Sequence, residues 1–171
     1  MTQLPSHPQP LAAISKPSWT QLPEPPQCLT ATEVAGEGRL WQARPMPTDQ
    51  REQVLATRDA LRERLVAARR GAVIAHLARL SAHYARERSA EQWQIVFEDY
   101  AEDLSEFPEV YVRNAIARWR QSNPFWPRAA ELRGLMLREW HRDQELLRRA
   151  EVLLGERKPS PLDLRYRETE R

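Results

Sequence analysis

The chain has 171 residues, a length typical of one domain with short extensions. Hydrophobic residues make up 41% and charged residues 29%, and the net charge of only +2 excludes a strongly basic nucleic-acid-binding protein. A single cysteine, Cys28, excludes an internal disulfide and a CxxC metal site. The sequence has no apolar run as long as a membrane span and no signal-peptide pattern at its start, so we expect a soluble, cytoplasmic protein.

Prolines are concentrated in residues 1–47, which hold nine of the 14. Each proline removes a backbone donor and disfavours a helix in the residue before it. Apolar residues in this stretch follow neither a helical nor a strand period, so we predict a mostly disordered, partly polyproline-II arm. Its two large apolar side chains, Trp19 and Trp41, either anchor the arm on a partner protein or pack onto the arm's own domain.

From residue 48 onward, apolar residues recur at helical spacing. Asp49 followed by Glu52 resembles a capping box at the start of a first helix, and Gly71 indicates a break after it. Ser89 with Gln92 forms a second capping box. The apolar stripes that these helices would turn inward are Val54, Leu61 and Leu65; Val73, Leu77, Leu80 and Tyr84; and Trp93, Phe97, Tyr100 and Leu104.

Prolines also divide the second half of the domain. Pro108 suits the first turn of a helix, and the run 123–127 predicts a turn, because Pro124 and Pro127 flank two aromatic residues. A long helix follows from residue 128 and ends at Gly155. The inward stripes of these two helices are Val112, Ala115, Ile116 and Trp119, and Leu132, Leu135, Met136, Trp140, Leu146, Leu147 and Leu154.

No strand or hairpin is predicted anywhere in the chain. The fold class is therefore all-α: a small bundle of four or five helices over residues 48–155, preceded by the disordered proline-rich arm 1–47 and followed by a charged, flexible tail 156–171.

Candidate metal ligands are sparse. His76 and His83 lie seven residues apart on one predicted helix, with Glu87 one turn beyond. Seven residues span about 10.5 Å of helix, which is too far for one ion. We therefore expect solvent-edge histidines and no metal site.

One predicted helix carries carboxylates at i, i+3 and i+4 spacing. Such groups can perform acid/base chemistry or hold Mg²⁺ when they are buried in a cleft. Here the opposite face of the helix is aromatic, so a solvated face is favoured, with a partner-binding patch or a metal site as alternatives. The carboxylates are Glu98, Asp99, Glu102 and Asp103.

Patterns typical of enzymes are also absent from the sequence. It has no nucleophile elbow, no Walker loop and no dinucleotide fingerprint, and Gly36 and Gly38 form only a GxG without the flanking strand and helix. We therefore predict a protein that is not an enzyme and has no cofactor.

Arginine dominates the basic residues, since Lys16 and Lys158 are the only lysines. Arginines beside Phe125 and Trp126 could form a surface that binds single-stranded nucleic acid. Glu–Arg pairs such as Glu145 with Arg148 or Arg149 favour instead a salt-bridged, solvated face, and the two aromatic residues favour a core plug over a platform for bases. The arginines of this candidate surface are Arg113, Arg120, Arg128, Arg133, Arg138 and Arg142.

One stretch carries a family resemblance. Tyr100-x-x-x-Leu104 is followed by Phe107-Pro108, Val112, Ala115, Phe125-Trp126-Pro127 and Glu131-Leu132. Over about residues 90–135 this pattern resembles the small all-helical domain of phage replicative-helicase loader/inhibitor proteins. In those proteins an aromatic–proline turn separates a helix ending in small residues from a last helix that begins near a glutamate. Their flexible part tends to lie at the C-terminus, whereas the arm predicted here is N-terminal.

Three functional hypotheses follow. The resemblance implies a non-enzymatic phage or prophage adaptor in DNA replication, which binds a replicative helicase or another replisome component. The alternatives are a DNA-binding regulatory or packaging protein that uses the arginine surface, and a structural subunit of a phage assembly. The candidate partner-binding residues are Trp19, Trp41, Phe125 and Trp126.

Overall fold

The computed structural model describes residues 22–35, 38–84 and 88–161. The predicted disorder of residues 1–21, the flexibility predicted for residues 162–171, and the candidate residues Trp19 and Glu87 lie outside the described residues. The elements follow in the order α1 (Gln27–Thr30), β1 (Glu33–Ala35), β2 (Gly38–Leu40), η2 (Thr48–Gln50), α2 (Arg51–Arg64), α3 (Arg70–Ser81), α4 (Ala90–Leu104), α5 (Glu109–Ser122) and α6 (Ala129–Leu153).

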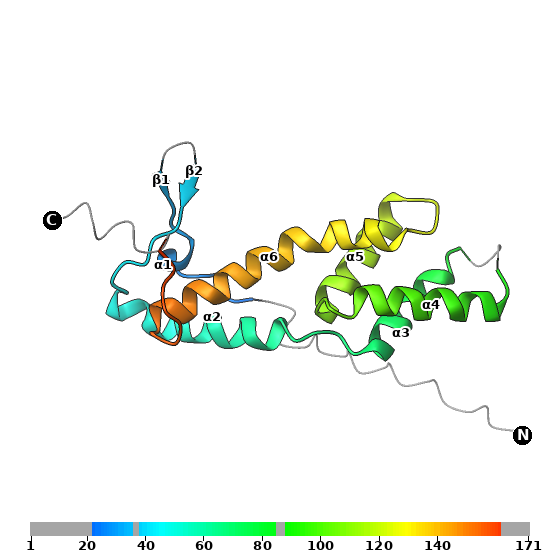
Figure 1. The fold of residues 1–171 in the computed structure, drawn as a ribbon, viewed down its shortest axis with the longest axis horizontal. Helices are drawn as coiled ribbons and strands as arrows, with labels where there is room; N and C mark the ends of the chain where they lie inside the picture. Colours follow the sequence, from blue (N-terminus) through cyan, green and yellow to red (C-terminus); the bar gives the residue numbers. More distant parts are fainter. Residues whose placement is uncertain (1–21, 36–37, 85–87, 162–171) are drawn as a thin grey trace, which may run out of the picture.

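The five long helices α2 to α6 confirm the predicted all-α class. Figure 1 shows α6 running along the length of the molecule, with α2 beside its C-terminal half and α3, α4 and α5 grouped around its N-terminal half. Each half of α6 therefore faces different helices.

The buried residues form two clusters, one at each half of α6. The first lies among α3, α4, α5 and the start of α6, and the second joins α1, α2 and the end of α6. The predicted inward stripes supply most of both clusters, because a helix with one apolar face is stable only when that face is covered. Fully buried side chains include Val73, Leu77, Leu104, Tyr111 and Leu132 in the first cluster and Leu29, Val54 and Leu61 in the second.

The predicted capping signals have mixed outcomes. The box at α4 is confirmed: the Ser89 hydroxyl accepts a hydrogen bond from the Gln92 backbone N–H at 3.3 Å, and the Ser89 N–H donates to Gln92 Oε1 at 2.9 Å. The box predicted from Asp49 and Glu52 is wrong. Residues 48–50 form a 3₁₀ turn instead, and α2 begins after Gln50 without a side-chain cap.

The break between the first two long helices lies earlier than Gly71, which the structure places inside α3. Residues 65–69 are the connection. There the Ala68 N–H donates to the Phe107 carbonyl at 3.0 Å, and Ala67 forms an antiparallel bridge with Pro108. Helix α2 therefore ends where the chain pairs with the distant residues Phe107 and Pro108, and not at a glycine.

The end of α6 is as predicted. Gly155 has a φ of +76°, and its N–H donates to the Val152 carbonyl, while the Glu156 N–H reaches back to the Glu151 carbonyl at 2.9 Å. This is the Schellman arrangement, in which a glycine adopts the left-handed conformation at low cost. Within the predicted tail, Glu156 forms ion pairs with Arg58 and Arg62, so the tail begins attached to α2.

The structure of residues 22–35 and 38–47 contradicts two predictions. They contain α1 and an antiparallel two-stranded hairpin that pairs Glu33 with Leu40, so the disorder predicted for this part of the arm and the predicted absence of strands are both wrong. The segment is ordered because it does not depend on its own apolar residues alone. Leu29 is completely buried in the second cluster, against α2 and α6.

Trp41 fixes the same segment to the body. Its side chain is only 4% exposed, its Nε1–H donates to the Cys28 carbonyl at 2.9 Å, and the guanidinium groups of Arg148 and Arg149 lie 5.7 and 5.4 Å from its ring centre. Of the two roles considered for Trp41, the structure shows packing onto its own domain.

Candidate functional site

The aromatic turn at residues 123–127 joins α5 to α6, and Trp126 points inward from it. Its ring lies 4.6 Å from that of Trp93 and 5.8 Å from that of Tyr100, centre to centre, and it also contacts Tyr84 and Phe97. The prediction of a core plug is confirmed for Trp126, because aromatic edge-to-face packing of this kind fills the space between α4 and the turn.

Three side-chain hydrogen bonds hold the backbone of the turn. The Tyr84 hydroxyl donates to the Asn123 carbonyl at 2.9 Å, and the Tyr100 hydroxyl donates to the Pro127 carbonyl at 2.7 Å. The Trp119 Nε1–H donates to the Phe125 carbonyl at 2.9 Å. These three hydrogen bonds restrain the backbone of the turn. The turn therefore presents its exposed side chain in a defined position.

Phe125 is that exposed side chain. It is 55% exposed, although its ring packs edge-on against Trp119 at 5.7 Å. The prediction of a core plug is therefore wrong for Phe125. Of the two aromatic residues of the turn, Trp126 packs inward and Phe125 is left exposed. An aromatic side chain held out by a rigid loop is a common anchor in protein interfaces.

The six candidate nucleic-acid arginines do not share one environment. Arg133 pairs with Glu106, donates to the Asp103 carbonyl at 2.9 Å and lies 5.2 Å from the ring centre of Phe107. Arg142 donates to Asp143. Arg120 contacts His83 at 3.3 Å, Arg113 is partly buried, and Arg128 and Arg138 are exposed.

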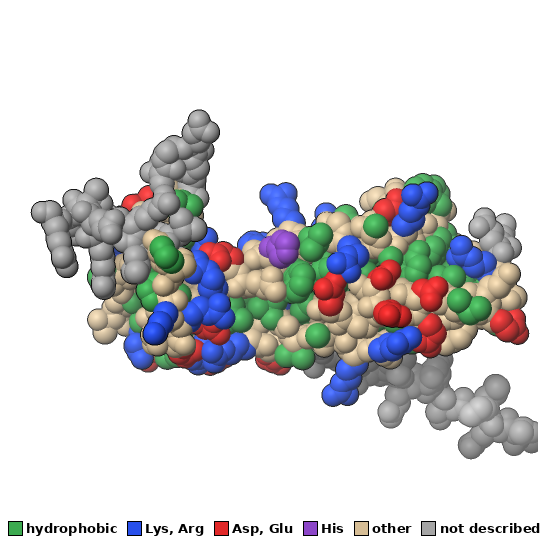
Figure 2. All heavy atoms as spheres, viewed as in Figure 1, with side chains coloured by type: hydrophobic (Ala, Val, Ile, Leu, Met, Phe, Trp, Pro, Cys, Tyr) green, Lys and Arg blue, Asp and Glu red, His purple; other side chains and the backbone are tan. Residues whose placement is uncertain are grey.

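Charge on the surface is correspondingly mixed. On the face shown in Figure 2, basic and acidic side chains lie among one another. The predicted pairs of Glu145 are confirmed: Arg148 donates to it at 2.7 Å and Arg149 at 2.9 Å, and the hydrogen bond from Arg148 lowers the pKa of Glu145. Ion pairs of this kind reduce the positive charge available to phosphate groups.

A buried polar network lies where α2, α5 and α6 meet. Asp143 is completely buried, and its Oδ2 accepts hydrogen bonds from Arg64 Nε at 2.9 Å and from the Tyr111 hydroxyl at 2.6 Å. Its Oδ1 accepts from Arg142 at 2.9 Å. Both oxygens are therefore occupied by donors, and the role this geometry supports is to join the three helices rather than to act as a base.

The sequence did not predict this network, because Asp143 reads there as one more charged residue of the helix surface. The signal that could have revealed it is its position: Asp143 lies seven residues after Met136 and seven before Ala150, both of which are buried, so it falls on the apolar stripe of α6. Burial and the hydrogen bond to Asp143 raise the pKa of Tyr111, which keeps the phenol protonated as a donor.

The two histidines are separated by their contacts. His76 Nε2 lies 3.0 Å from Glu109 Oε1, while His83 contacts Arg120. Within residues 22–35, 38–84 and 88–161, no three histidine, cysteine or carboxylate side chains are close enough to hold a metal ion. No helix in the described part of the chain combines the length and apolarity needed to cross a membrane.

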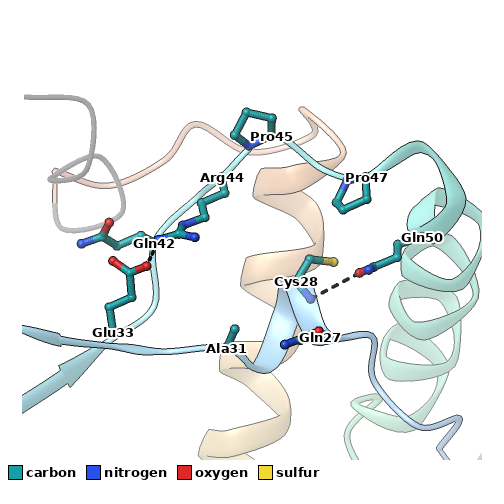
Figure 3. Close-up of a pocket in the computed structure, with 9 residues that line it drawn as sticks. All are labelled: Gln27, Cys28, Ala31, Glu33, Gln42, Arg44, Pro45, Pro47 and Gln50. Carbon is teal, nitrogen blue, oxygen red and sulfur yellow. Dashed lines mark hydrogen bonds and ion pairs between the residues drawn. The ribbon is translucent and has the colours of Figure 1, made fainter. Parts of the chain in front are cut away.

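A pocket of about 230 Å³ lies between the N-terminal segment and the start of α2 (Figure 3). The Cys28 N–H donates to Gln50 Oε1 at 3.4 Å, and Glu33 pairs with Arg44. Burial raises the pKa of the Cys28 thiol, which keeps it protonated and weakly nucleophilic. The lining is Gln27, Cys28, Ala31, Glu33, Gln42, Arg44, Pro45, Pro47 and Gln50.

Comparisons with known protein families, with curated proteins and with solved structures find no match to this chain.

Proposed function

We propose that the protein is a non-enzymatic adaptor of phage or prophage DNA replication, which binds a replicative helicase or another replisome component through the turn that carries Phe125. The observation that carries the proposal is Phe125 itself, a half-exposed aromatic side chain on a loop held by three hydrogen bonds. An aromatic anchor that is already ordered loses little conformational entropy when it is buried by a partner.

Two residues of the family resemblance support this assignment, because Tyr100 and Trp126 hold the turn in place. The Tyr100 hydroxyl donates to the Pro127 carbonyl of the turn, and the Trp126 ring packs against Tyr100. Phe107, which also belongs to the resemblance, packs on Trp140 of α6 with ring centres 4.7 Å apart. Trp19, which lies outside the described residues, stays a predicted second anchor.

The test is binding of the purified protein to a purified replicative helicase, followed by size-exclusion chromatography and calorimetric titration. Phe125→Ser is expected to weaken the complex by about tenfold to a hundredfold, as is typical for removal of an aromatic hot spot. Its far-UV circular dichroism is expected to be unchanged, because the side chain is on the surface.

Val66→Ser is the matched control. Val66 is 67% exposed in the connection between α2 and α3, so the substitution removes an exposed apolar side chain elsewhere. Its effect on helicase binding is expected to be less than about twofold. Absence of any complex with helicase, primase or initiator would overturn the proposed function. A complex that both variants form equally well would overturn the role of Phe125.

A further inference from the structure

Helix α4 differs in charge from the rest of the chain. Its 15 residues include five carboxylates and no lysine or arginine, although 26 of the 171 residues of the protein are basic. Its inner face is the apolar one, with Trp93, Phe97, Ala101 and Leu104 buried. Figure 2 shows acidic side chains gathered over α4.

The outer face of α4 combines this charge with an exposed apolar side chain. Ile95 is 63% exposed. Residues 91, 95, 98, 99, 102 and 103 follow one another at spacings of one, three and four, so they lie along one side of the helix over about 18 Å. We call this the α4 acidic face: Glu91, Ile95, Glu98, Asp99, Glu102 and Asp103.

The charges of this face are only partly balanced by the rest of the described structure. Glu98 pairs with Arg70, and Glu91 accepts a hydrogen bond from the Ser89 hydroxyl, which lowers the pKa of Glu91. The carboxylates of Asp99 and Glu102 form no ion pair or hydrogen bond with any other described residue. These two carboxylates, three residues apart on one side of the helix, are therefore available to solvent or to a partner.

This arrangement works against the helix. Like charges four residues apart, as in Glu98 with Glu102, repel each other, and carboxylates in the last turn face the negative end of the helix dipole. The last turn of α4 contains no basic residue. An isolated exposed isoleucine in the middle of such a face also gains nothing from folding.

We propose that the α4 acidic face binds a basic amphipathic helix of a partner protein, with an apolar side chain of that helix on Ile95 and its lysine or arginine side chains on Asp99 and Glu102. Charge complementarity selects this occupant: the same carboxylates repel the phosphates of nucleic acid and of anionic lipid headgroups. The length of the face matches about three turns of helix.

The inference goes beyond the proposed function, because it assigns a second surface, on a different helix from the turn that carries Phe125. A helix-on-helix contact of this size is small, so the affinity is expected to be moderate and strongly dependent on salt.

The test uses a fluorescein-labelled synthetic peptide of leucine, alanine and lysine, designed as an amphipathic helix with one leucine stripe flanked by lysines. A peptide of the same composition in scrambled order is the peptide control. Fluorescence anisotropy at low and at physiological salt is expected to give about tenfold tighter binding for the amphipathic order than for the scrambled one.

Variants of the protein locate the site. D99K/E102K is expected to weaken peptide binding by about tenfold, and Ile95→Gln by about threefold or more. The matched control is E52K/E63K on α2, which makes the same change in net charge at two exposed carboxylates that form no ion pair with another described residue. Its effect is expected to stay within about twofold.

Several outcomes overturn the proposal: equal binding of the scrambled peptide, an equal loss in E52K/E63K, or no binding by the unaltered protein. Analytical sedimentation of the protein without peptide tests a further outcome. If the protein self-associates at low salt and D99K/E102K abolishes this, the occupant is a second copy of the chain and the proposal is wrong. Phe125→Ser is expected to leave peptide binding unchanged, so that failure of this inference and failure of the proposed function are distinguishable.

Discussion

Asp143 shows how much of the structure rests on one side chain. It is the completely buried acidic residue of the described chain, and it accepts hydrogen bonds from Arg64, Tyr111 and Arg142. Taking a carboxylate and a guanidinium out of water is costly, and only close pairing with further hydrogen bonds offsets that cost. Replacement of Asp143 therefore removes the carboxylate that two buried side chains, Arg64 and Tyr111, both contact.

The first prediction concerns this residue. Asp143→Ala is expected to lower the free energy of unfolding by about 3–5 kcal/mol, because Arg64, which is only 8% exposed, loses its ion pair with Asp143. Urea denaturation followed by circular dichroism measures the change. Glu139→Ala, on the same helix, removes an exposed pair with Arg118 and is expected to cost no more than about 1 kcal/mol. Equal losses in the two variants would show that the network contributes no more than a surface pair.

Tyr111 gives the network a dependence on pH. Its pKa is raised in the folded state by burial and by the hydrogen bond to Asp143, so the folded state keeps a proton that the unfolded state loses. Its stabilising contribution is therefore complete below the unfolded pKa of about 10, and it is lost as pH rises through the folded pKa. Unfolding free energies at pH 8 to 11 should fall more steeply for the unaltered protein than for Tyr111→Phe. Parallel curves would contradict this assignment.

At the scale of the element, a capping box stabilises the start of α4, whereas the charges of its last turn destabilise its end. Its capping box satisfies the backbone N–H groups of Ser89 and Gln92, but its last turn contains carboxylates and no basic residue. The helix is held by packing of Trp93 and Phe97, whose rings lie 5.6 Å apart, and of the buried Leu104. Tertiary contacts thus compensate for charges that disfavour the isolated helix.

The corresponding prediction is a gain in stability. D99K/E102K is expected to raise the free energy of unfolding by about 0.5–1.5 kcal/mol, because it replaces repulsion with attraction to the C-terminal end of the helix. The same chemical change at Glu52 should have the opposite sign, since Glu52 lies in the first turn of α2. Thermal unfolding at low ionic strength measures both effects. A destabilised D99K/E102K would contradict this account.

At the scale of the whole molecule, α6 connects two cores that have different membership. Its N-terminal half completes the first cluster, and its C-terminal half closes the second around Leu29, Val54 and Leu61. Within residues 22–35 and 38–47, Leu29 is buried in the second cluster, and Trp41 lies against Arg148 and Arg149 in the same half of α6. We therefore expect the two ends of the molecule to open separately.

Trp41→Ala tests this division. The substitution removes a buried indole, its hydrogen bond to Cys28 and its contact with Arg148, and it is expected to cost about 3 kcal/mol of local stability. Hydrogen exchange read by mass spectrometry should become faster in peptides that cover residues 27–42, while peptides from α4 and α5 stay unchanged. An equal increase in α4 and α5 would show that the two clusters unfold as one unit.

Local signals in the sequence predicted the helices and several of their ends. The apolar stripes, the Ser89 box and Gly155 act within one or two turns of backbone, so their effect does not depend on distant residues. These features explain why the helical class could be read from the sequence.

The candidate site was only partly predictable. Phe125 and Trp126 read alike in the sequence, and only the packing of Tyr84 and Tyr100 against the turn decides which one is buried. The alternative left open for the carboxylates of α4 depends in the same way on where Arg70 lies, because Arg70 forms an ion pair with Glu98.

The sequence by itself therefore determined the helical class, the stripe that each helix turns inward, and the stops at residue 123 and at Gly155. Only the tertiary structure decided that residues 22–35 and 38–47 are ordered, that Asp143 is buried, and that the connection at 65–69 ends α2. The physical reason is common to all three. Each depends on a partner far away in the chain, such as Leu29 on α6 or Ala68 on Phe107, and contacts between distant residues leave no local period in a sequence.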